Sequence, residues 1–136
     1  MTYTKISKKE RDYLILIFEL SRDFPVRVRD IAEATNVSEP TAYEYSVRLA
    51  EKGLVLMKKG IVKLTEKGNE TVSSIIKAHR VLETLFYING ISADESCQEC
   101  SKIDYLLDKE TIDKLYRKLG EPANCPHGKP VVVESS

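Results

Sequence analysis

The sequence predicts a mainly α-helical protein with a small β-wing, in which a winged helix-turn-helix is followed by a second, α-helical domain. Two observations lead to this fold class. Residues 26–64 contain two short helical segments, a tight turn between them and a β-prone hairpin after them. Residues 69–119 carry apolar side chains at helical spacing. We expect the first domain to span residues 1–68 and the second to span residues 69–136.

The first helix is predicted from Lys8 to Ser21. Its residues between Tyr13 and Leu20 are almost all apolar, whereas a helix that buries one face needs only one apolar stripe. We therefore expect this helix to pack on two sides, against the helix-turn-helix and against a second element or subunit.

A helix-turn-helix motif is predicted next. A short helix places Ile31 and Ala34 on its inner side, and Asn36-Val37 makes the tight turn. Ser38 is positioned to cap the second helix, because its hydroxyl can accept a hydrogen bond from a backbone N–H that has no partner within the helix. Gly53 ends the second helix.

Two β-prone runs around Lys59-Gly60 predict a hairpin with basic residues near its tip. Two packed helices and a hairpin also occur in proteins that bind no nucleic acid, so the spacing alone is weak evidence. The hairpin, the capped second helix and the flanking basic residues together favour binding to double-stranded DNA. One such module buries little surface, so we expect a two-fold homodimer on a roughly palindromic operator.

The side chains expected at DNA lie in the first turns of the second helix and on the basic segments around it. Those in the helix are placed to reach base edges or the backbone, and the basic ones to neutralise phosphates. The set comprises Arg27, Arg29, Ser38, Pro40, Thr41, Tyr43, Glu44, Arg48, Lys58 and Lys59.

Three further helices are predicted after the hairpin, at residues 69–88, 93–107 and 109–119. The first is long enough to link the two domains. A turn-rich segment, residues 121–130, and a tail, residues 131–136, complete the chain.

Composition is that of an ordinary globular protein, with 42% hydrophobic and 31% charged residues. Residues 1–68 carry 13 Lys and Arg against 10 Asp and Glu, net +3, and residues 69–136 carry 8 against 11, net −3. The basic first half fits a phosphate-contacting surface, and the acidic second half fits cations. No apolar run approaches the roughly 20 residues of a membrane span, so we expect a cytoplasmic protein.

Metal-ligating residues gather in the second half. His79 and Glu83 are four residues apart on one face of the long helix, and Cys97, Cys100 and Asp104 share one face of the next helix if that helix extends to residue 107. Nitrogen and thiolate ligands suit zinc, whereas added carboxylates suit iron or manganese. Each residue also has an ordinary structural explanation, such as a hydrogen-bonded core histidine or a small core cysteine.

Two further sets of ligands remain open. Asp12 on the first helix is positioned to join the site from a third direction. Cys125 and His127 would complete a Cys₃His zinc site with Cys97 and Cys100, but their proline-rich surroundings are also typical of a simple turn. Three cysteines cannot all pair within one chain, and reduced thiols are expected in the cytoplasm.

Residues 8–130 resemble metal-dependent transcriptional repressors of the diphtheria-toxin-repressor and manganese-regulator type, in the short two-domain form. The most specific pieces are Ser38-Glu-Pro-Thr41, Leu49-Ala-Glu-Lys-Gly-Leu-Val55, Leu64-Thr-Glu-Lys-Gly68, Ala78-His-Arg-Val-Leu-Glu83 and the Cys-Pro-His-Gly-Lys-Pro130 ending. The resemblance implies a dimer in which metal sets the spacing of two recognition helices.

The resemblance also implies ligands by position. Asp12 matches the first-helix ligand of the manganese branch, and His79 and Glu83 match ligands on the linker helix. Cys97 falls where iron-type members have a histidine, and Asp104 falls on a family glutamate.

Two positions depart from the family pattern. Ser101 stands where Cys or Glu is usual, and Tyr105 stands where His is usual. The resemblance therefore implies an impaired second site and a first site that has gained sulfur, which favours zinc over iron or manganese. The family also has the Cys-Pro-His-Gly segment without a CxxC pair, which favours the turn for Cys125 and His127.

These observations predict a DNA-binding transcriptional repressor whose dimer is controlled or stabilised by a divalent metal ion. A regulator with a purely structural zinc, or with thiols that sense redox state, is the alternative. A small metalloenzyme is a remote third, because no general base, nucleophile and cleft motif accompanies the ligands. We therefore expect no enzymatic activity.

Overall fold

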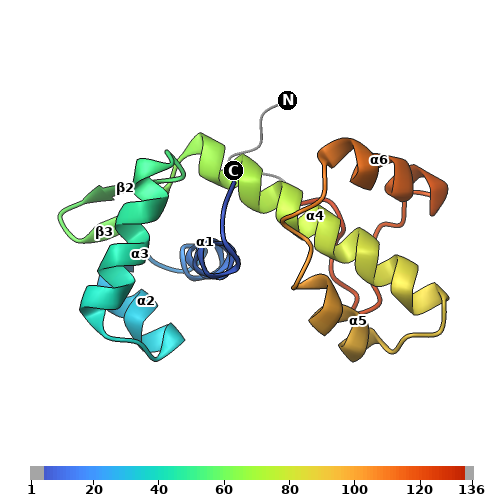
Figure 1. Cartoon of the computed structure of the whole chain (residues 1–136), viewed down its shortest axis with the longest axis horizontal. Helices are drawn as coiled ribbons and strands as arrows, with labels where there is room; N and C mark the ends of the chain where they lie inside the picture. Colours follow the sequence, from blue (N-terminus) through green and yellow to red (C-terminus); the bar gives the residue numbers. More distant parts are fainter. Residues whose placement is uncertain (1–4, 134–136) are drawn as a thin grey trace. The chain divides into compact units, whose positions relative to one another are not determined.

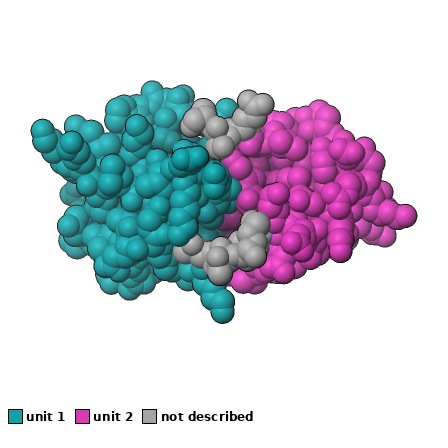
Figure 2. All heavy atoms as spheres, turned by 90° about the horizontal axis from the view of Figure 1, so that it is seen from above, with its two compact units in different colours: residues 1–72 teal, residues 73–136 magenta. Residues whose placement is uncertain are grey.

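The computed structural model describes residues 5–133, and its chain divides into two compact units, residues 1–72 and 73–136 (Figure 2). The elements are mostly helices, with one small antiparallel sheet of three strands, as the predicted fold class requires (Figure 1). Among the described residues, no helix is both long and apolar enough to cross a membrane. The predicted tail lies partly outside the described residues.

The first unit contains helices α1 (Lys8–Leu20), α2 (Val28–Thr35) and α3 (Glu39–Glu51). At the start of α1, Ser7 and Glu10 form a capping box, in which each side chain accepts a hydrogen bond from the other residue's backbone N–H. The predicted cap of α3 is confirmed, since the hydroxyl of Ser38 accepts a hydrogen bond from the N–H of Thr41. The inner residue predicted at Ala34 is wrong: Ala34 is exposed, and Ala32 is buried beside Ile31.

The sheet of the first unit has the order β1-β3-β2, with strands β1 (Val26–Arg27), β2 (Val55–Lys58) and β3 (Ile61–Leu64). The hairpin between β2 and β3 is the predicted wing. Its two turn residues, Lys59 and Gly60, have φ angles of 52° and 79°. Two successive positive φ angles are typical of the tight hairpin turn that matches the twist of the strands.

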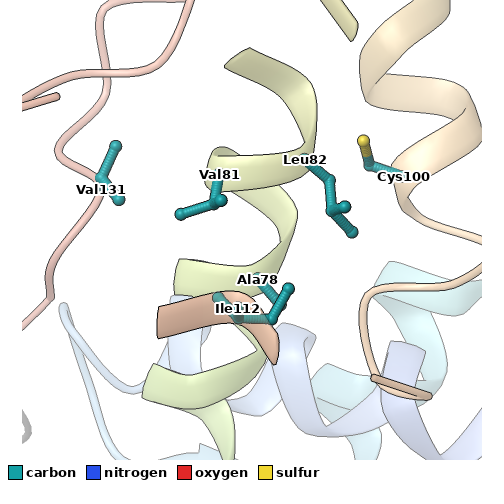
Figure 3. Close-up of a cluster of buried hydrophobic side chains, with 6 residues drawn as sticks. All are labelled: Ala78, Val81, Leu82, Cys100, Ile112 and Val131. Atoms are coloured by element: carbon teal, nitrogen blue, oxygen red, sulfur yellow. The ribbon is translucent and has the colours of Figure 1, made fainter. Parts of the chain in front are cut away.

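Helix α4 (Glu66–Ile88) begins in the first unit and continues into the second. The second unit also contains α5 (Ala93–Cys100) and α6 (Lys109–Lys118). Its hydrophobic core combines residues from these three helices with one residue of the C-terminal segment: Ala78, Val81, Leu82, Cys100, Ile112 and Val131 (Figure 3).

The predicted helix over residues 93–107 is wrong in its length, because α5 ends at Cys100 and residues 101–106 form turns. The hydroxyl of Ser101 donates to the carbonyl of Cys97, and the N–H groups that follow bond mainly to carbonyls three residues back. Asp104 therefore follows α5 in a turn and does not share a helical face with Cys97.

Candidate metal centre and nucleic-acid surface

Three metal-ligating side chains converge within the second unit. Helix α4 presents His79 and Glu83 one turn apart, and α5 presents Cys97. One nitrogen, one carboxylate oxygen and one sulfur from these residues all lie within 4.8 Å of one another. Nε2 of His79 lies 3.4 Å from Oε2 of Glu83 and 3.4 Å from Sγ of Cys97. The predicted proximity of His79 and Glu83 on one face of a helix is thus present, and their role as metal ligands remains a prediction.

Asp104 contacts the other side of the His79 ring. Its Oδ2 lies 3.0 Å from Nδ1 of His79, and its side chain is buried. A proton on Nδ1 of His79 would donate to this carboxylate oxygen, and Nε2 is the ring nitrogen that faces Cys97 and Glu83. A carboxylate that orients a ligating imidazole in this way is common around protein metals. The sequence predicted Asp104 as a ligand; in the structure its carboxylate contacts His79, and a role as a ligand remains a prediction.

Glu83 is the most informative residue of the group. Glu83 is buried, with only 1% of its surface exposed. Oε2 of Glu83 lies 3.4 Å from Nε2 of His79 and 3.4 Å from Nδ1 of His127. Among the described residues, Oε1 of Glu83 has no hydrogen-bond partner. A buried carboxylate with an oxygen left unpaired is costly unless a cation neutralises it, so the residues fit a metal ion.

The two cysteines of α5 have different surroundings. Cys97 is partly exposed, and burial together with the charge of Glu83 raises the pKa of its thiol. Cys100 is 0% exposed and belongs to the hydrophobic core of the second unit (Figure 3). Burial and the nearby carboxylates of Glu83 and Asp104 raise the pKa of Cys100 to about 12. Cys100 thus lies in an apolar cluster, and its predicted role as a ligand remains a prediction.

His127 reaches the same carboxylate from the C-terminal segment. Its Nδ1 lies 3.4 Å from Oε2 of Glu83, and its Nε2 lies 3.1 Å from Oδ1 of Asp94. The hydrogen bond to Asp94, with the charge of Glu83, raises the pKa of His127. Cys125 is buried and lies in a turn, where its N–H donates to the carbonyl of Lys129. The segment is therefore a turn that also brings His127 to Glu83, and the contact with Asp94 had no signal in the sequence.

Asp12, the remaining predicted ligand, belongs to the first unit. Its carboxylate is half-exposed and forms ion pairs with Lys8 at 2.6 Å and Arg11 at 2.9 Å. A metal-binding role for Asp12 remains a prediction.

The side chains predicted to contact DNA all lie in the first unit. Except for Thr41, which is half-buried, every one of them is exposed. Tyr43, on α3, is 56% exposed although it is a large aromatic residue. Lys58 and Lys59 stand at the tip of the β2–β3 hairpin. These positions leave the predicted surface accessible to a nucleic acid.

The chain that carries this group of metal-ligating residues and this exposed surface is similar to a known protein family. Residues 65–132, half of the chain, match the model of the iron dependent repressor, metal binding and dimerisation domain. The chain belongs to the iron-dependent repressor family. The matched region contains His79, Glu83, Cys97 and Asp104, and the resemblance that the sequence predicted is confirmed. The named relatives are transcriptional regulators and not enzymes, so the comparison gives the metalloenzyme alternative no support.

Three family relatives illustrate the similarity. An uncharacterised helix-turn-helix transcriptional regulator of Aeropyrum pernix is 35% identical over 103 residues, which is 75% of this chain and 57% of that protein. The crystal structure of a hypothetical protein from Sulfolobus solfataricus is 35% identical with a TM-score of 0.83, over 94% of this chain and all of that one. The manganese regulator SloR is 33% identical with a TM-score of 0.72, over 92% of this chain and 62% of that one. The chain spans slightly more than half the length of the curated relatives it matches.

Proposed function

We propose that this member of the iron-dependent repressor family is a DNA-binding transcriptional repressor whose affinity for DNA is controlled by a divalent metal ion. The observation that carries the proposal is the group of His79, Glu83 and Cys97, whose ligand atoms lie within 4.8 Å of one another. Within the part of the chain that the structure describes, the buried Oε1 of Glu83 has no hydrogen-bond partner, which a bound cation would supply.

Zinc is the metal that the donor atoms favour. An imidazole nitrogen and a thiolate are ligands that zinc prefers, while a single carboxylate among them leaves the site poor in the oxygen ligands that manganese takes. The family name refers to iron and SloR is a manganese regulator, so both metals belong in the test. When bound, a divalent ion would neutralise Glu83 and replace the proton of the Cys97 thiol. His127, next to Glu83, is available as a fourth donor.

The proposed partners are double-stranded DNA and a second copy of the chain. Helix α3 would enter the major groove of a palindromic operator, with the hairpin lysines on the backbone. An exposed apolar patch at the end of α4, made of Tyr87, Ile88 and Ile91, supports self-association through the second unit. We propose a cytoplasmic location on the basis of this role.

The experiment starts with chain stripped of metal by a chelator and a duplex selected from a randomised pool in the presence of zinc. DNA affinity is then measured by fluorescence anisotropy as zinc, iron(II) or manganese(II) is added. We expect the affinity for the selected duplex to rise at least about fivefold with zinc, the lower end of typical couplings between two binding sites. Equal affinity of folded chain with and without metal would make the ion structural, and the absence of any selected duplex would overturn DNA binding itself.

A further inference from the structure

Glu44 is an acidic residue on the face of α3 that would meet DNA. Its side chain is 63% exposed, and that of Arg48, one turn later, is 50% exposed. Nη2 of Arg48 donates a hydrogen bond to Oε1 of Glu44 at 2.9 Å. A carboxylate near DNA phosphates is repelled unless it meets a hydrogen-bond donor on a base. Glu44 therefore needs a reason to stand on this surface.

The pair is held from beneath by two aromatic rings. The guanidinium of Arg48 lies over the ring of Tyr45, 4.9 Å from its centroid. Tyr45 in turn stacks on Tyr13 of α1, with centroids 4.6 Å apart and planes 13° from parallel. Tyr13 is buried, so the stack rests on the core of the first unit. An arginine fixed by a ring and a carboxylate has little freedom, and its hydrogen bond restricts Glu44 as well.

We propose that Glu44 reads cytosine in the major groove and that Arg48 is the residue that positions Glu44. This inference rests on the proposed DNA binding. An ionised carboxylate only accepts hydrogen bonds, and the donors in the major groove are N4 of cytosine and N6 of adenine. Adenine places its N7 acceptor beside N6, and that lone pair repels a carboxylate. Cytosine presents its amino group without an adjacent acceptor, so it is the base that Glu44 selects.

The test compares the duplexes that wild type and Glu44→Gln select from the same randomised pool. Wild type is expected to enrich sites with an invariant cytosine in each half-site, and Glu44→Gln is expected to replace it with adenine, which a glutamine amide binds through N6 and N7. On the wild-type duplex, the variant loses about 5- to 150-fold in discrimination between cytosine and the other bases. Its affinity for duplex of unrelated sequence does not fall, because a negative charge has been removed.

Glu51→Gln is the matched control, since it removes the same charge from the exposed C-terminal end of the same helix. This control is expected to select the wild-type sequence. If Glu44→Gln also selects the wild-type sequence, the proposed readout is wrong while DNA binding stands. If wild type enriches no sequence, both the readout and the proposed function are overturned.

Arg48→Lys tests the positioning role separately. The variant keeps the positive charge but loses the planar group that stacks on Tyr45. We expect discrimination for cytosine to fall about two- to fivefold while the salt dependence of binding stays unchanged. Unchanged discrimination would show that Arg48 does not position Glu44.

Discussion

Among residues 5–133, each of the two units buries one glutamate, and the two carboxylates have different surroundings. Glu10 of the first unit is 5% exposed, and it accepts hydrogen bonds from the N–H of Ser7 at 2.8 Å and from Nζ of Lys52 at 2.7 Å. Glu83 of the second unit is 1% exposed, its Oε2 lies 3.4 Å from a ring nitrogen of His79 and 3.4 Å from a ring nitrogen of His127, and among the described residues its Oε1 has no hydrogen-bond partner.

The difference concerns whether each unit supplies the hydrogen-bond partners of its own buried carboxylate. Burial alone raises the pKa of Glu10, but the bonds from Lys52 and Ser7 outweigh burial and lower it. The first unit therefore supplies its own counter-ion. The second unit buries a carboxylate beside two imidazole groups, and among the described residues its Oε1 has no hydrogen-bond partner, which is destabilising unless a ligand satisfies that oxygen. We infer that the second unit depends on a cation from solution and that the first does not.

The largest expected effect is that of Glu83→Gln on metal binding. Replacing a residue that only supports a metal ligand typically lowers metal affinity about 10- to 100-fold. The amide of Gln cannot neutralise a cation, so the affinity for zinc should fall by about 100-fold or more. Without metal, the variant should be at least as stable to urea as wild type, because a buried charge has been removed. Zinc competition titration and urea unfolding measure the two quantities.

Glu99→Gln, on the exposed side of α5, is the control for the loss of charge in the same unit. It should change neither quantity. A metal-free Glu83→Gln chain that is clearly less stable than wild type would show that Glu83 already has an adequate partner.

Cys97→Ser should change both metal preference and pH dependence. Burial and the charge of Glu83 raise the pKa of Cys97 above its ordinary 9.0, so zinc must displace a proton from the thiol. Between about pH 7 and pH 8.5 the affinity of wild type for zinc should therefore rise by roughly tenfold per pH unit for this proton. The serine variant should lose that part of the slope and favour harder ions such as manganese. Identical slopes in titrations of the two proteins would exclude Cys97 as a ligand.

Glu10→Gln sharpens the comparison from the other unit. Loss of the charged hydrogen bond to Lys52 should lower the free energy of unfolding by about 2 kcal/mol, with metal or without it. Because the folded pKa lies below the ordinary 4.5, the contribution of Glu10 is present above pH 4.5 and is lost as the pH falls through the folded value. Urea unfolding of wild type and variant along a pH series measures this. A destabilisation that zinc removes would contradict the independence of the first unit.

The smallest expected effect is that of replacing both Lys58 and Lys59 with alanine at the hairpin tip. Two fewer phosphate contacts should reduce the slope of log affinity against log salt by about 1.8 and weaken binding on all sequences alike. Zinc affinity should not change, because the site lies in the second unit. An unchanged salt slope would remove the hairpin from the DNA interface.

Features of the first unit that depend only on residues adjacent in the sequence could be predicted from the sequence alone. The cap at Ser38 and the hairpin turn at Lys59-Gly60 are each determined by a few adjacent residues. Strand β1 was missed because its two residues become a strand only by pairing with β3. The inner position at Ala34 was wrong by two residues because the short α2 leaves the orientation of its apolar face to tertiary packing.

The metal centre could be predicted only in part, for a physical reason. His79 and Glu83 lie on one long helix, so their spacing fixes that they face the same way. The role of Asp104 depends on which nitrogen of His79 it meets, and α5 ends at Cys100, so the helical spacing from Cys97 does not place Asp104. The contact of His127 with Asp94 joins residues 33 positions apart, a separation at which helical periodicity carries no information.

The most direct test of metal control is the DNA affinity of the His79→Ala dimer, shown to be folded by circular dichroism and measured with and without zinc. Loss of the imidazole removes one of the three converging donors, so zinc should no longer bind. We predict that the variant binds the selected duplex only as well as metal-free wild type, whatever the zinc concentration. If the folded, metal-free variant binds that duplex as tightly as zinc-loaded wild type, the metal does not control DNA binding and the proposed function is wrong.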